Sequence, residues 1–117
     1  MKRDMDLIRK LAVTLEESDS VGEIDGYAPE QIDYHLWLLE DAGLVTYQEF
    51  FPKEGSVLRV SLRLTWQGHE FLDVARNSSF WEKAKQLVLT KTGALSFEVL
   101  KEVLMHIAKE AVAASAS

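Results

Sequence analysis

The chain has 117 residues, of which 47% are apolar and 27% charged, with a formal net charge of −6 and no cysteine. The apolar and charged fractions are typical of a folded domain. The absence of cysteine excludes disulfides and thiolate metal sites. The negative net charge opposes non-specific binding to nucleic acid, which depends on Lys and Arg. No apolar run approaches the roughly 18 residues of a membrane span, and the charged N-terminus lacks the apolar core of a signal peptide. We therefore expect a single cytoplasmic domain that does not bind membranes.

Two helices are predicted in the first third of the chain. Residues 4–17 form the first, because their apolar positions recur at helical spacing. These positions are Ile8, Leu11, Ala12 and Leu15. Residues 18–28 indicate a turn or a short strand. The second helix runs from Pro29 to about Ala42, since proline suits a first helical position and Gly43 can end the helix in the left-handed conformation. Its buried stripe consists of Ile32, Leu36 and Leu39.

A β-hairpin is predicted over residues 44–64. Two apolar-rich segments flank the turn sequence PKEGS, which contains proline and glycine. In the second segment Leu58, Val60, Leu62 and Leu64 alternate with Val57, Arg59, Ser61 and Arg63. We expect the first set to face the core and the second, with Arg59 and Arg63, to face water.

Further helices are predicted over residues 65–117. Thr65 can cap the first of them, and Ser79 with Glu82 has capping-box spacing for the next, which extends through Leu89. Ser96 caps the last helix. That helix has Phe97, Leu100, Leu104 and Ile107 at the spacing of a coiled-coil seam. We expect these four residues either to pack on the first helix or to join two copies of the chain as a dimer.

The order of these elements resembles that of the winged-helix regulators. The resemblance rests on the segments HLWLLEDAGLV and RLTWQGHEFLD on either side of the hairpin. With MKRDMDLIRKL and SFEVLKEVL, the chain is also similar to a small bacterial and prophage family of uncharacterised proteins. The resemblance implies an α+β fold: a winged-helix core over residues 1–64 with a two-stranded wing at 44–64, and a C-terminal helical extension at 65–117. No activity follows from it.

The second helix departs from a DNA-reading helix in its charge. No Lys or Arg lies between Lys10 and Lys53, whereas ten acidic residues do. The positions that would face a DNA groove are Gln31, Asp33, Tyr34, Trp37 and Leu38. DNA-binding helices usually carry polar or basic residues there. Only eleven residues separate Glu17 from Pro29, so the middle helix of a helix-turn-helix is either one turn long or missing.

These departures favour a protein-interaction module that binds a protein partner or a second copy of itself. Exposed aromatic residues are typical of such interfaces, and we expect the contacts at Asp33, Tyr34, Trp37 and Leu38. The alternative is a dimeric DNA-binding transcriptional regulator. Its candidate nucleic-acid contacts are Lys2, Arg3, Gln31, Lys53, Arg59 and Arg63.

Enzymatic activity is not expected. The three histidines are scattered without the spacing of a metal-binding helix, and no serine lies in a nucleophile elbow. We therefore expect no catalytic residues, no metal and no cofactor. The sequence does not show a small-molecule effector pocket.

Overall fold

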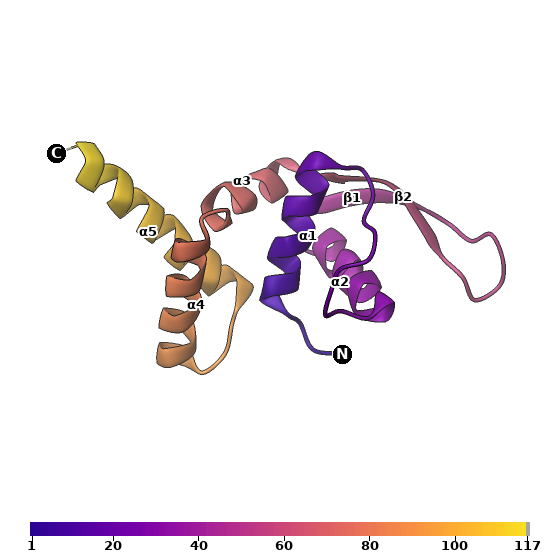
Figure 1. The fold of residues 1–117 in the computed structure, drawn as a ribbon, viewed down its shortest axis with the longest axis horizontal. Helices are drawn as coiled ribbons and strands as arrows, with labels where there is room; N and C mark the ends of the chain where they lie inside the picture. Colours follow the sequence, from indigo (N-terminus) through magenta and orange to yellow (C-terminus); the bar gives the residue numbers. More distant parts are fainter. Residues whose placement is uncertain (117) are drawn as a thin grey trace. The chain divides into compact units, whose positions relative to one another are not determined.

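The computed structural model describes residues 1–116. Five helices and one antiparallel hairpin follow one another in the order α1, α2, β1, β2, α3, α4, α5 (Figure 1), so the fold is α+β. The chain forms two compact units, Met1–Glu70 and a second that begins at Phe71. None of the helices in the described part is long and apolar enough to cross a membrane.

The first unit begins with α1 (Met5–Glu17). Asp4 caps this helix, because its Oδ1 accepts the backbone N–H groups of Asp6 and Leu7 at 2.9 and 3.2 Å. The apolar face predicted for the helix is buried, and Met5 and Leu7 are buried with it. In this unit α1 packs against α2 and β2, and α2 also packs against β1.

α2 (Pro29–Asp41) has the bounds that its sequence predicts to within a residue. Its start is closed by Gln31, whose Oε1 accepts the Ala28 N–H at 2.8 Å. Gly43 follows the helix with φ of 78°, a conformation that glycine adopts without steric cost. Ile32, Leu36 and Leu39 are buried as predicted.

His35 is also buried in α2, and its ring joins this helix to the N-terminus of α1. Its Nε2 accepts the Asp4 N–H at 2.8 Å. Because a backbone N–H can only donate, Nδ1 carries the ring proton and donates it to the Gln31 carbonyl at 2.7 Å. Tyr27 completes this cluster, since its hydroxyl donates to Asp4 Oδ2 at 3.1 Å. The N-terminus of α1 is thereby fastened to α2 and to the loop before it.

The hairpin pairs β1 (Val45–Phe50) with β2 (Leu58–Leu64). Its register contains a bulge: Thr46 pairs with Arg63, but Gln48 pairs with Val60. Tyr47 therefore lies opposite two residues, Ser61 and Leu62. Ser61 has φ of 56°, a conformation uncommon outside glycine. The extra residue reverses the inside–outside alternation of the strand at this point.

The bulge overturns the predicted faces of the second strand. Glu49 pairs with Arg59 and Val45 pairs with Leu64, and partners across a strand pair share a face. Since Val45 and Glu49 lie on one face of β1, Arg59 lies on the same side as the buried Leu64. Arg59 and Arg63 consequently lie on opposite faces, and Leu58 is exposed instead of buried.

Residues 18–28 form a loop with a turn at Asp25–Gly26 and contain neither helix nor strand. A backbone hydrogen bond joins the loop to the sheet, from the Leu62 N–H to the Asp19 carbonyl at 3.2 Å. The middle helix that a complete helix-turn-helix requires is therefore absent from this segment.

α3 (Trp66–Ala75) starts directly against the hairpin. Thr65 caps it, because its Oγ1 accepts the Gly68 N–H at 3.1 Å, as the sequence predicts. The Thr65 N–H donates to the Leu44 carbonyl at 2.9 Å. Gly68 is buried at this junction, where a Cβ atom would press on the Leu44 carbonyl. The glycine of the LTWQGHEFLD segment therefore allows a close approach of two backbones.

The second unit contains α4 (Ser78–Thr92) and α5 (Phe97–Ala116), which pack on each other. The cap of α4 is Asn77 and not the predicted Ser79, because the Asn77 side chain accepts the Phe80 N–H at 3.0 Å. Ser96 lies at the start of α5 as predicted, and its Oγ accepts the Val99 N–H at 3.4 Å. Phe71 packs in the core of this unit against the rings of Trp81 and Phe97, with centroids 6.2 and 5.1 Å away.

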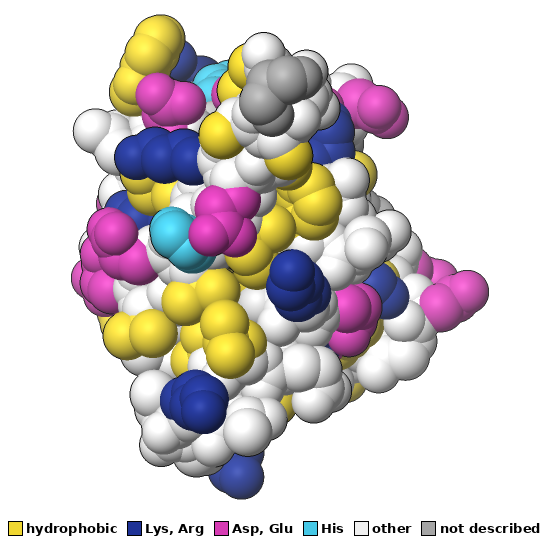
Figure 2. All heavy atoms as spheres, turned by 90° about the vertical axis from the view of Figure 1, so that its left-hand side faces the viewer, with side chains coloured by type: hydrophobic (Ala, Val, Ile, Leu, Met, Phe, Trp, Pro, Cys, Tyr) yellow, Lys and Arg dark blue, Asp and Glu magenta, His cyan; other side chains and the backbone are white. Residues whose placement is uncertain are grey.

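The residues expected to form a dimer seam lie inside the second unit. Leu100 and Leu104 are fully buried, Ile107 is 7% exposed, and Phe97 packs on Phe71. Packing within the chain thus accounts for their coiled-coil spacing, and the dimer seam stays a prediction. The apolar side chains that do reach the surface of α4 and α5 lie among charged ones (Figure 2). They include Leu87, Leu89, Val99 and Val112.

Candidate functional site

Two stacked aromatic rings lie on the outer face of α2. The rings of Tyr34 and Trp37 are nearly parallel, with centroids 6.1 Å apart and an interplanar angle of 16°. Trp37 is 44% exposed, whereas Tyr34 and Leu38 are half-buried. Of the four residues predicted to bind a partner, three therefore combine into one accessible apolar surface.

Asp33, the fourth of these residues, is engaged in an ion pair. Its Oδ1 contacts the Arg59 guanidinium. Arg59 Nε also lies 3.4 Å from Glu49 Oε1, and its guanidinium covers the ring of Tyr47 at 5.2 Å from the centroid. This arrangement depends on the bulge, because only the reversed alternation points Arg59 toward α2. Arg59 is consequently held by two carboxylates, Asp33 and Glu49.

The other candidate nucleic-acid contacts are distributed over separate elements. Lys2 and Arg3 precede α1, Lys53 lies in the hairpin turn, and Arg63 lies on the outer face of β2; all four are exposed. Gln31 uses its side-chain oxygen to close the start of α2. Within the first unit, fourteen acidic residues outnumber seven Lys and Arg. The structure therefore does not place these residues in one basic surface on α2.

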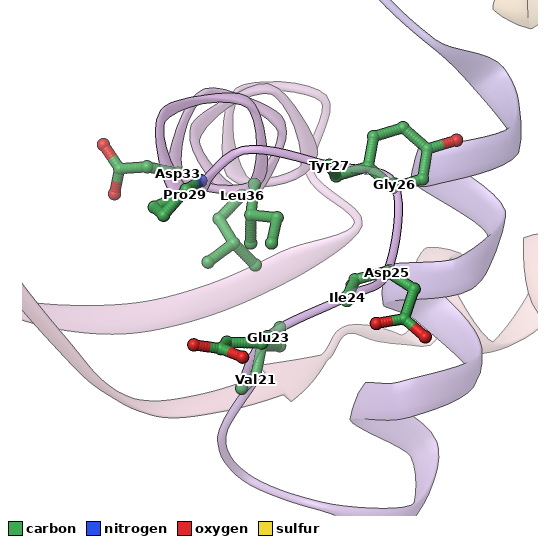
Figure 3. Close-up of a pocket in the computed structure, with 11 residues that line it drawn as sticks. Val21, Glu23, Ile24, Asp25, Gly26, Tyr27, Pro29, Asp33 and Leu36 are labelled. Carbon is green, nitrogen blue, oxygen red and sulfur yellow. The ribbon is translucent and has the colours of Figure 1, made fainter.

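Two adjoining pockets have Asp33 in their linings, which include neither Tyr34 nor Trp37. The first has a volume of about 610 Å³ and lies between the 18–28 loop and α2 (Figure 3). The second, of about 510 Å³, lies between the same loop and β2. Both are lined by Val21, Asp33 and Leu36. We call this pair of adjoining pockets the α2 groove.

The α2 groove has an apolar interior and carboxylates at its rim. Ile24 and Ile32 line the first pocket with Val21 and Leu36. In Figure 3 Leu36 points from α2 into the space above the loop, and Glu23 and Asp33 lie at one end of the pocket. The acidic, glycine-containing composition of the loop predicts a turn but gives no sign of a groove, because the groove depends on how the loop packs beside α2.

Burial raises the pKa of the Tyr47 phenol above its ordinary value near 10, and the adjacent Arg59 opposes this shift only in part. The Tyr47 hydroxyl is buried and has no hydrogen-bond partner among residues 1–116. A raised folded-state pKa contributes stability that is present below pH 10 and is lost as the pH rises through the folded value.

We therefore expect the free energy of unfolding to fall above about pH 10, and Tyr47→Phe to remove part of that fall. At neutral pH the substitution is expected to change stability by less than about 1 kcal/mol, since it removes an unpaired buried hydroxyl. Urea unfolding between pH 7 and 11 measures both effects. Tyr34→Phe, which alters a ring on the surface of α2, serves as the control. If the free energy of unfolding falls equally above pH 10 in the unmodified chain, Tyr47→Phe and Tyr34→Phe, the fall does not come from Tyr47.

Among the described residues, no three His, Cys, Asp or Glu side chains come together in a way that could hold a metal ion. His69 and His106 are exposed on α3 and α5. His106 Nε2 lies 2.9 Å from Glu110 Oε1 one turn later, the spacing of an ordinary surface pair.

Comparison with known proteins places the chain in a family. Residues 2–94 match the family model described as "Hypothetical protein (DUF2513)". An uncharacterised protein of Haemophilus influenzae is 35% identical over 119 aligned positions, which cover 97% of this chain and 100% of that protein. No solved structure matches the chain. The family match extends over α1 to α4 and includes the whole α2 surface. The chain belongs to the DUF2513 family.

Proposed function

We propose that the chain is a protein-interaction module of bacterial or prophage origin, built on a winged-helix-like scaffold, in which the outer face of α2 binds a partner protein. One observation carries this proposal: Trp37 is 44% exposed and stacked on Tyr34. An exposed aromatic pair with little conformational freedom is typical of a binding hot spot. Leu38 extends the apolar surface at its side.

The charge around this pair indicates the chemistry of the partner. Glu30, Asp33, Glu40 and Asp41 are exposed on the same helix, and no Lys or Arg lies in α2. An acidic rim around an apolar centre complements a surface with aromatic or aliphatic residues surrounded by Lys and Arg. The same rim repels a phosphate backbone.

A symmetric dimer through α2 fits this charge less well than a different protein does. In a two-fold interface each surface meets its own copy, so the acidic rims would face each other. We therefore favour a basic partner over self-association through this helix.

The alternative function is DNA binding by a dimeric transcriptional regulator. The order of α1, α2 and hairpin supports it, as does the exposure of Lys2, Arg3, Lys53 and Arg63. Phosphate contacts are strongest at low ionic strength, so binding of mixed-sequence duplex DNA at about 50 mM salt, weakening steeply as salt is added, would favour this alternative.

Replacement of Trp37 tests the proposal. Trp37→Ala is expected to weaken capture of the partner at least about 30-fold, the effect of losing a hot-spot aromatic of about 2 kcal/mol. Its fold should be retained, because Trp37 is an exposed residue outside the buried core. The measurement is affinity capture of tagged protein from the native host, quantified by mass spectrometry, with circular dichroism to verify folding.

Trp66→Ala is the matched control, because Trp66 is 76% exposed in the same unit but lies on α3. Trp66→Ala is expected to capture the partner as well as the unmodified chain does. If Trp37→Ala retains every protein that the unmodified chain captures, the α2 surface is not the binding site.

A further inference from the structure

The α2 groove and the aromatic surface meet at Asp33. Asp33 lines both pockets of the groove and precedes Tyr34 in the exposed face of α2. A partner segment that contacts Trp37 can therefore continue into the groove without leaving the helix.

Two adjoining pockets suit a chain segment better than one compact ligand. Their linings have Val21, Asp33 and Leu36 in common. Side chains in an extended peptide alternate in direction, so one residue can fill the first pocket while the backbone runs beside the loop. A single compact ligand would occupy only one pocket.

The charge at the groove selects the flanking residues of that segment. Glu23 and Asp33 lie at one end of the first pocket and Asp25 lies in its lining (Figure 3), which contains no Lys or Arg. The second pocket contains one cation, Arg59, which is already held by Asp33 and Glu49. The carboxylates of Glu23 and Asp25 therefore have no cation beside them in the lining of the first pocket, whose apolar part is formed by Val21, Ile24, Ile32 and Leu36.

We propose that the α2 groove binds an extended, basic segment of the partner protein, with one aliphatic side chain in the first pocket and a neighbouring Lys or Arg against Glu23. This inference rests on the proposed protein-interaction function and specifies the partner for it. Burial of the aliphatic group supplies affinity, and the charged contact supplies selectivity against acidic segments.

Nuclear magnetic resonance with defined peptides tests this inference on the intact chain. The probes are Ac-Arg-Leu-Arg-NH₂ and Ac-Glu-Leu-Glu-NH₂, which have the same aliphatic residue and opposite flanking charges. The Arg peptide is expected to shift the methyl resonances of Val21, Ile24, Ile32 and Leu36 in a saturable manner. The Glu peptide is expected to leave them unchanged.

Charge reversal at Glu23 supplies the second readout. Glu23→Lys should weaken binding of the Arg peptide about tenfold, the effect expected from losing a charge-assisted contact. Glu54→Lys makes the same change in net charge on an exposed residue of the hairpin turn, outside both pockets. It should leave the affinity within about twofold, as screening predicts for a distant surface charge.

The groove assignment is overturned if neither peptide shifts these methyl groups, if both do so equally, or if Glu23→Lys and Glu54→Lys weaken binding alike. If the peptides do not bind in the groove but Trp37→Ala still abolishes partner capture, only the groove assignment is contradicted. If the peptides shift the methyl resonances but Trp37→Ala captures the partner normally, only the proposed partner binding through Trp37 is contradicted.

Discussion

Gly68→Ala is expected to lower the free energy of unfolding by at least about 2 kcal/mol, the cost of forcing extra volume into a packed site. In an exposed helix the same substitution would stabilise by about 1 kcal/mol, because alanine is the better helix former. Here the added Cβ would press against the Leu44 carbonyl oxygen and lie 3.2 Å from Leu64 Cδ2. The steric clash of the added Cβ therefore outweighs the gain in helix propensity, and the substitution lowers the free energy of unfolding.

The Leu44 carbonyl cannot easily move away from that Cβ. It accepts the Thr65 N–H at 2.9 Å, and Thr65 Oγ1 donates to the adjacent Gly43 carbonyl at 2.6 Å. Relief of the clash would thus break the start of α3. Gly22→Ala is the matched control, because nothing lies within 4 Å of its added Cβ. Chemical denaturation of both variants measures the difference in their free energies of unfolding. Equal values would show that the backbone around Leu44 and Gly68 moves to accept the added Cβ.

His35→Ala is the second substitution with a large expected effect, a loss of about 2–4 kcal/mol of unfolding free energy. It leaves a cavity beneath α2 and removes both hydrogen bonds of the ring. The Asp4 N–H and Gln31 carbonyl then lose these contacts. Because Asp4 also caps α1, fraying should begin at the N-terminus of that helix.

Hydrogen exchange identifies where this loss occurs. Amide protection should fall first in residues 5–8 of α1 and only later in β1 and β2. His69→Ala, at an exposed position of α3, is expected to change stability by no more than about 0.5 kcal/mol. Similar losses in the two histidine variants would contradict the role given to the His35 ring.

Most of the secondary structure can be predicted from the sequence, because helix ends carry local signals. Pro29 and Gly43 define α2, and Thr65 and Ser96 lie at the starts of α3 and α5 as predicted. The capping residue predicted for α4 is wrong because Asn77 and Ser79 are both good caps, and which of them caps the helix depends on packing. The assignment of one domain over residues 1–117 stays a prediction, while the structure itself contains two compact units.

The faces of β2 could not be predicted, because the bulge leaves no mark in the apolar alternation. Leu58 to Leu64 alternates without interruption in sequence, yet the register shifts opposite Tyr47. That shift turns Arg59 toward Asp33 and determines the electrostatics of the whole site. The exposed Trp37 could be anticipated from helical periodicity, whereas the α2 groove depends on the packing of a loop that has no periodicity.

The proposed α2 surface contacts protein rather than nucleic acid, and photo-cross-linking distinguishes the two. Trp37 is replaced with the photo-reactive residue p-benzoylphenylalanine in cells of the native host, with the same replacement at Trp66 as control. After irradiation, we expect a protein adduct that forms from position 37 and not from position 66, and whose cross-linked segment is rich in Lys and Arg. A nucleic-acid adduct at position 37, or equal adducts at the two positions, would contradict the claim.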